Sequence, residues 1–208
     1  MKTKFLKLSL LALFIFTASC SSDDDKNEEI PAVVTTKVSN LEAPQTGGQG
    51  QPVGGAFTKF SFSQNKVVTD NSWDIAFRGT TIIVNGGAKI GITDEPERTG
   101  SGAVSIVAGT FASVTSFPAA TTFKQDASTV YAIPTGSGNG WYNYNTSNNI
   151  ISPIAGKVFV VKTHDGKYAK FEILSYYKDA PANPDPATAV ARYFTFNFAY
   201  QANSTTTF

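Results

Sequence analysis

Two strand-like runs joined by a turn signal constrain the fold more than any other feature of this sequence. The segment 156–177, GKVFVVKTHDGKYAKFEILSYY, places runs rich in β-branched and aromatic residues on both sides of Asp165-Gly166. Asp-Gly favours a two-residue type I′ turn, so the segment predicts a β-hairpin. The final run, RYFTFNFAY, alternates Phe194, Phe196 and Phe198 with smaller or polar residues, which predicts a strand with one face on a core.

The remainder of the chain favours the same class of structure. After the N-terminal leader no segment has a clean 3.6-residue apolar period. Further strands are expected at Val33–Val38, Phe57–Ser63, Trp73–Arg78, Thr81–Val84, Gly102–Val107, Thr129–Ile133 and Gly140–Tyr144. The segments QTGGQGQPVGG and KDAPANPDPATAV are expected to be a flexible connection and a surface loop. The sequence therefore predicts an all-β fold, a single antiparallel β-sandwich or open-barrel domain over residues 33–208.

The N-terminus predicts export and lipidation. Three lysines precede a short apolar run, Leu8–Phe16, which ends in TASC, so residues 1–19 are interpreted as a signal peptide. Cys20 is the only cysteine and follows small residues, as in a bacterial lipobox, which makes it the expected lipid anchor to the outer membrane. The alternative is a stray thiol in a leader that is cut further downstream. An acidic tether over residues 20–32 follows, and the domain is expected to contain no disulfide.

Charge and histidine content argue against two classes of function. The leader holds three of the 17 Lys and Arg residues, which leaves 14 against 16 Asp and Glu, a net charge of −2 that suggests no nucleic-acid partner. The single histidine, His164, lies beside the hairpin turn and is interpreted as a solvated turn residue, with a catalytic or ligand role as the alternative. The acidic segments DDD and TDEPE are interpreted as solvated charge. We therefore expect no enzymatic activity.

An aromatic segment is the candidate ligand site. GNGWYNYNTSNN, residues 138–149, places Trp141, Tyr142 and Tyr144 among polar, turn-prone residues, where a flat apolar ligand could lie. The alternative is that Trp141 is an ordinary core anchor with the two tyrosines at its rim.

The stretch NSWDIAFRGTTIIVNGG, residues 71–87, is interpreted as sheet architecture. Strand alternation places Trp73, Ile75 and Phe77 on one face, where they are expected to fill the core together. Asp74 and Arg78 lie on the other face, too far apart to pair directly, so each needs partners on other segments or in water.

Several of these stretches together resemble the HmuY family of Bacteroidetes surface lipoproteins. TKFSFSQNKVV, NSWDIAFRGTTIIVNGG, GNGWYNY, the hairpin segment and RYFTFNFAY carry the resemblance, which extends from about Val33 onward. It implies an all-β carrier that binds haem and passes it to a TonB-dependent outer-membrane receptor. The acidic run after Cys20 also resembles the export signal of such lipoproteins, which implies display on the cell surface; the alternative is a tether that faces the periplasm.

The resemblance does not extend to the iron ligands. Haem-binding members hold the iron between two His or two Met side chains, whereas the mature chain has one His and no Met. A Tyr phenolate can hold haem iron, so Tyr142 or Tyr144 is a candidate substitute, and His164 is another if the hairpin turn folds over the pocket. Two functions stay open: a haem carrier with altered ligands or pocket stacking alone, and an HmuY-type lipoprotein that binds a different small ligand or a partner protein.

Overall fold

The described part of the chain is built almost entirely from strands. The computed structural model describes residues 32–203 and 205–208, with thirteen strands and one short 3₁₀ turn, η1 (Ala120–Thr122). The predicted signal peptide, Cys20 and all but the last residue of the predicted tether lie outside these residues. None of the described residues belongs to a helix with the length and apolar character needed to cross a membrane. The prediction of an all-β fold is confirmed.

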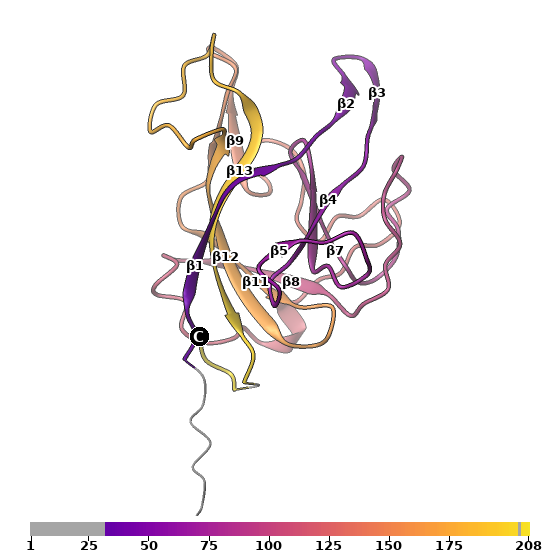
Figure 1. The fold of residues 1–208 in the computed structure, drawn as a ribbon, viewed down its shortest axis with the longest axis vertical. Coiled ribbons are helices and arrows are strands. Elements are labelled where there is room, and N and C mark those ends of the chain that lie inside the picture. Colours follow the sequence, from indigo (N-terminus) through magenta and orange to yellow (C-terminus); the bar gives the residue numbers. More distant parts are fainter. Residues whose placement is uncertain (1–31, 204) are drawn as a thin grey trace, which may run out of the picture. The chain divides into compact units, whose positions relative to one another are not determined.

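A five-stranded antiparallel sheet forms one layer (Figure 1). Its strands, in spatial order, are β1 (Thr35–Glu42), β13 (Ala191–Gln201), β12 (Tyr168–Tyr177), β11 (Lys157–Lys162) and β8 (Ala103–Ala108). The predicted hairpin is β11–β12, with Phe159 opposite Phe171. On β13, Phe194, Phe196 and Phe198 are buried in the main core, as their alternation predicts.

The turn of this hairpin differs from the prediction. Gly166 N–H donates to the Thr163 carbonyl, and Gly166 rather than Asp165 has the left-handed conformation, with φ +85°. This is a three-residue loop in which a type I turn is followed by a left-handed glycine, so the predicted type I′ turn is wrong. The Thr163 hydroxyl bonds to Asp165 Oδ1 at 2.6 Å, and the backbone N–H of His164 is held by a second segment, so the longer loop is favoured.

A four-stranded sheet forms the second layer. Its strands, in spatial order, are β5 (Lys66–Val67), β4 (Thr58–Ser61), β6 (Ile75–Arg78) and β7 (Thr81–Val84). Aromatic side chains from both sheets meet between them, with Phe60 edge-on to Phe196 at 5.4 Å and Phe77 4.8 Å from Phe194. Such ring pairs add about 0.5–1.5 kcal/mol each beyond the area they bury.

Trp73 lies outside this inter-sheet core, contrary to the prediction. Ile75 and Phe77 are in the main cluster, whereas Trp73 packs in a second cluster with Ala76 and Ile83 on the other face of the sheet. The strand begins only at Ile75, after a bend at Asp74, so strict alternation does not reach Trp73. All three predicted core side chains are fully buried, but they serve two separate clusters.

The two sheets are joined at one edge and separate at the other. Beyond β7, the Asn85 carbonyl accepts a hydrogen bond from Gly102 N–H at 2.8 Å, just before β8. Gly86 lies so close there that an added Cβ would be 1.9 Å from the Gly102 carbonyl oxygen. At the opposite side, β1 and β5 are both edge strands. The result is a sandwich that is open along β1 and β5, in agreement with the predicted sandwich or open barrel.

The shorter elements differ most from the predictions. The glycine-rich segment expected to be a flexible connection forms a hairpin, β2 (Thr46–Gly48) with β3 (Gln51–Gly54). The expected strand at Thr129–Ile133 is absent from the described residues, where only an isolated bridge joins Ala127 and Val130. A further hairpin pairs β9 (Tyr142–Asn145) with β10 (Ile150–Pro153). The proline-rich segment 178–190 is the predicted surface loop.

Candidate functional site

The predicted aromatic segment divides between the core and the surface. Trp141 and Tyr142 are buried in the main core, and the Trp141 indole N–H donates to the Thr80 carbonyl at 2.8 Å. Trp141 is therefore placed as a core anchor, which was the alternative interpretation. Tyr144 is 40% exposed, and its hydroxyl bonds to Asn149 Oδ1 at 2.5 Å across the β9–β10 hairpin. Of the three predicted residues, only Tyr144 is exposed, and its role in ligand binding stays a prediction.

His164 is held rather than solvated, which corrects the expectation for this residue. Its Nδ1 lies 2.8 Å from Asp74 Oδ1, and its backbone N–H donates to the same oxygen at 2.9 Å. The imidazole is 22% exposed, whereas the Asp74 side chain is fully buried. Asp74 also accepts the Phe62 N–H at 2.7 Å, so one carboxylate connects the hairpin turn to the second sheet.

This contact determines which imidazole nitrogen is available. Burial raises the pKa of Asp74, while the hydrogen bonds from His164 and Phe62 act in the opposite direction. When Asp74 is ionised, its Oδ1 can only accept a hydrogen bond, so His164 Nδ1 carries the proton in that contact. In the neutral ring, Nε2 is then the unprotonated nitrogen. A carboxylate behind Nδ1 is the arrangement that commonly orients metal-binding histidines.

Two of the candidate iron ligands, Tyr144 and His164, do not share a site. Tyr144 is opposite Ile151, whose N–H donates to the hydroxyl of Tyr177 at the end of β12. His164 precedes Tyr168, where the same strand begins. A ten-residue strand is roughly 30 Å long, so Tyr144 and His164 cannot both bind one iron.

The acidic segment TDEPE is structural and not fully solvated. Glu95 is buried and accepts the Ile90 and Gly91 N–H groups at 3.1 and 2.9 Å. Arg98 lies 3.3 Å from Glu95 and 3.0 Å from Asp126. Burial raises the pKa of Asp126, against the hydrogen bonds it accepts. Among residues 32–203 and 205–208, no group of three His, Cys, Asp or Glu side chains lies close enough together to hold a metal ion.

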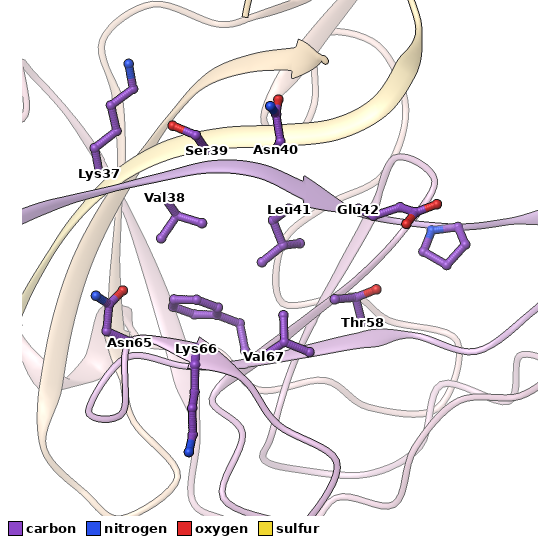
Figure 2. A pocket seen from close by; sticks show the side chains of 12 residues that line it. Lys37, Val38, Ser39, Asn40, Leu41, Glu42, Thr58, Asn65, Lys66 and Val67 are labelled. Atoms are coloured by element: carbon purple, nitrogen blue, oxygen red, sulfur yellow. The ribbon is translucent and has the colours of Figure 1, made fainter. Parts of the chain in front are cut away.

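A cavity of about 580 Å³ lies at the open edge of the sandwich, a volume within the usual range for small-molecule pockets. We call it the open-edge cleft. Figure 2 shows Val38 and Leu41 of β1 pointing toward Thr58 and Val67 on the facing sheet. The remaining lining residues are Lys37, Ser39, Asn40, Glu42, Pro44, Phe60, Asn65 and Lys66. None of the twelve side chains is an imidazole, thiol, thioether or phenol.

Charge is distributed unevenly along this cleft. Figure 2 places Lys37, Asn65 and Lys66 toward one end and Glu42 with Thr58 toward the other. Sequence reasoning missed the site, although strand alternation places Val34, Thr36 and Val38 on one face of the predicted strand. That pattern indicates an inward face but does not say that the strand lies at an edge where the inward face is accessible.

Comparison with known proteins identifies the family. No protein of curated function matches the sequence. Three crystal structures are similar. A protein assigned as a lipoprotein from Bacteroides fragilis NCTC 9343 is 14% identical, the match covers 82% of this chain and 89% of that chain, and the TM-score is 0.47. A protein assigned as an HmuY-like heme binding protein from Bacteroides vulgatus ATCC 8482 is 15% identical, with 81% of this chain and 92% of that chain covered and a TM-score of 0.47. The apo HmuY analog of Tannerella forsythia is 14% identical, with 84% of this chain and 99% of that chain covered and a TM-score of 0.44. The sequence model of the HmuY protein family matches residues 55–198, more than half of the chain. The chain belongs to the HmuY family.

Proposed function

We propose that this protein is a non-enzymatic carrier, anchored in the outer membrane by lipid on Cys20, that captures haem at the cell surface and passes it to a TonB-dependent receptor. Family membership over residues 55–198 is the observation that carries the proposal. The signal peptide, the lone cysteine and the acidic tether in the sequence support the location. Haem is the cargo of this carrier and not a resident cofactor.

The described residues do not provide the two His or two Met side chains that hold haem iron in related carriers. Residues 32–203 and 205–208 contain one histidine and neither methionine nor cysteine, so a His/His or Met/Met pair cannot form. His164 is the better single ligand, because Asp74 contacts Nδ1 and so orients the ring, and Nε2 takes no part in that contact. Tyr144 would first have to give up its hydrogen bond to Asn149.

A haemin titration of the purified mature protein tests the proposal. We expect a saturable shift of the Soret band, which His164→Ala weakens at least about tenfold if His164 supplies the ligand. Loss of the shift in Tyr144→Phe would instead assign the iron to Tyr144. Tyr193→Phe, at a tyrosine on β13, is the matched control and should bind as the wild type does. Absence of any saturable Soret change would refute haem binding.

A second function is favoured by the open-edge cleft. Its lining provides apolar contact and no iron ligand, which suits a small ligand other than haem or a partner protein. Two observations separate the alternatives: a neighbouring gene for a TonB-dependent receptor and iron-regulated expression both favour haem transport. A thermal-shift screen that finds non-haem ligands for a chain that fails the haemin titration would favour the second function.

A further inference from the structure

The open-edge cleft has the shape and charge of a site for a chain-like ligand. We propose that it binds a single-chain amphiphile with one anionic head group, namely a fatty acid carboxylate. This site is separate from the side chains considered as iron ligands, because neither Tyr144 nor His164 lines it. The inference therefore goes beyond haem carriage and does not depend on it.

The floor of the cleft is apolar because both sheets direct their inward faces into it. Val38 pairs with Phe196 and Leu41 with Phe194 on the core face of β13, so both β1 side chains point inward. Phe60 on β4 is opposite Val67 on β5, and Val67 is 53% exposed. An alkyl chain along this floor would remove the exposed part of Val67 from water, which is the gain that drives apolar binding.

The length of the cleft suits an extended chain. The lining residues of β1 and the segment after it run from Lys37 to Pro44. At about 3.3 Å per residue this row spans roughly 20 Å. The facing wall is supplied by β4 and β5, so the ligand would lie in the gap between the two sheets, parallel to β1.

The charges at the two ends determine the head group and its direction. Lys37 and Lys66 arise from opposite walls at the same end, and Glu42 lies toward the other end (Figure 2). In Figure 2 both lysine side chains point away from the cleft, and their long stems allow rotation toward a bound anion. A carboxylate at the lysine end is attracted, whereas a second carboxylate near Glu42 would be repelled. The arrangement therefore favours a monocarboxylate over a dicarboxylate.

The edges of the cleft are poorly suited to a peptide strand, which is the main competing occupant. The register of β1 shifts between Val38 and Leu41, where Asn40 has φ +56° and its N–H donates to Thr195 Oγ1. The opposite edge, β5, is only two residues long. Irregular and very short edge strands are typical devices against strand addition, so little backbone pairing is available to an added strand.

The test is isothermal titration calorimetry of the full mature protein with dodecanoate and with dodecanol. We expect saturable binding of both, and a carboxylate placed in the floor by Val67→Glu should weaken each at least about tenfold. Val190→Glu is the matched control, because Val190 is also 53% exposed but does not line the cleft. The double variant Lys37→Ala/Lys66→Ala should weaken dodecanoate binding by roughly fivefold and leave dodecanol binding unchanged.

Several outcomes would overturn the proposal. These are no saturable dodecanoate binding, equal binding by Val67→Glu and the wild type, or equal loss of dodecanoate and dodecanol in the lysine double variant. A dimer in size-exclusion chromatography that Val67→Glu dissociates, without dodecanoate binding, would identify a second copy as the occupant instead. The experiment contains no haemin, so its failure leaves haem carriage untouched, and a failed haemin titration leaves this site untouched.

Discussion

Replacing Asp74 with asparagine tests whether one buried carboxylate connects the hairpin turn to the second sheet. The wild-type carboxylate accepts Phe62 N–H on Oδ2 and both His164 donors on Oδ1. Asparagine keeps one acceptor oxygen and replaces the other with NH₂. If the amide oxygen stays on the His164 side, the new NH₂ group faces the Phe62 N–H. Two donors then meet where the wild type has a donor and an acceptor 2.7 Å apart.

The expected loss of stability follows from this geometry. A buried N–H left without an acceptor costs about 1–3 kcal/mol. Asparagine is neutral and avoids the burial cost that raises the Asp74 pKa, which offsets part of the loss. We therefore expect the free energy of unfolding to fall by about 2 kcal/mol, which for a domain of this size lowers the Tm by roughly 4–8 °C.

Urea denaturation and thermal unfolding of the mature protein measure this effect. The urea midpoint should fall with the m-value unchanged. His164→Ala leaves Asp74 two backbone donors and should cost less, about 1 kcal/mol. Glu97→Gln removes an exposed ion pair with Lys89 and should change stability by less than about 0.5 kcal/mol. An Asp74→Asn protein as stable as Glu97→Gln would refute the reasoning.

Three further predictions concern the core, the closed edge and alkaline pH. Trp73→Ala removes a fully buried ring and should lower the free energy of unfolding, measured by thermal unfolding, by about 3–5 kcal/mol while ligand binding stays intact. Lost binding at unchanged stability would contradict this prediction. Gly86→Ala puts a Cβ against the Gly102 carbonyl and should lower the Tm by more than Gly91→Ala does. The Cβ added at Gly91 meets open space, although φ there is positive, +97°. Equal Tm values would contradict the close approach at Gly86. Burial raises the pKa of Tyr176 to about 12. The neutral phenol therefore contributes fully to stability below the unfolded pKa of about 10, and this contribution is lost as pH rises through 12. In a titration followed by phenolate absorbance, Tyr176→Phe should show one late-titrating tyrosine fewer than the wild type.

Local patterns were reliable where a segment's own residues carry the structural information. The β11–β12 hairpin and the inward phenylalanines of β13 follow from strand alternation, which acts over neighbouring residues. Trp73 was assigned to the wrong cluster because a bend at Asp74 interrupts that alternation, and the bend depends on what Asp74 contacts. The turn type was wrong for a related reason, since a tertiary hydrogen bond to His164 competes with the local preference of Asp-Gly.

The candidate site was less accessible to sequence reasoning. The aromatic composition around Trp141 suggested a ligand surface, but the packing of this residue against Tyr176 and Phe194 makes it part of the core. His164 is adjacent in sequence only to turn residues, and its carboxylate partner lies 90 positions away. No local pattern contains that pairing.

The sequence by itself determined the class of fold and the family and predicts the location, because strand periodicity, the HmuY stretches and the predicted leader with Cys20 are all local properties of the chain. Tertiary structure alone decided which strands are edges, and therefore that the inward faces of β1 and β5 are accessible in a cleft. It also decided that His164 is oriented by Asp74 and remote from Tyr144. Edges and long-range hydrogen bonds arise from how strands pair across the whole chain, which the order of residues within a strand does not encode.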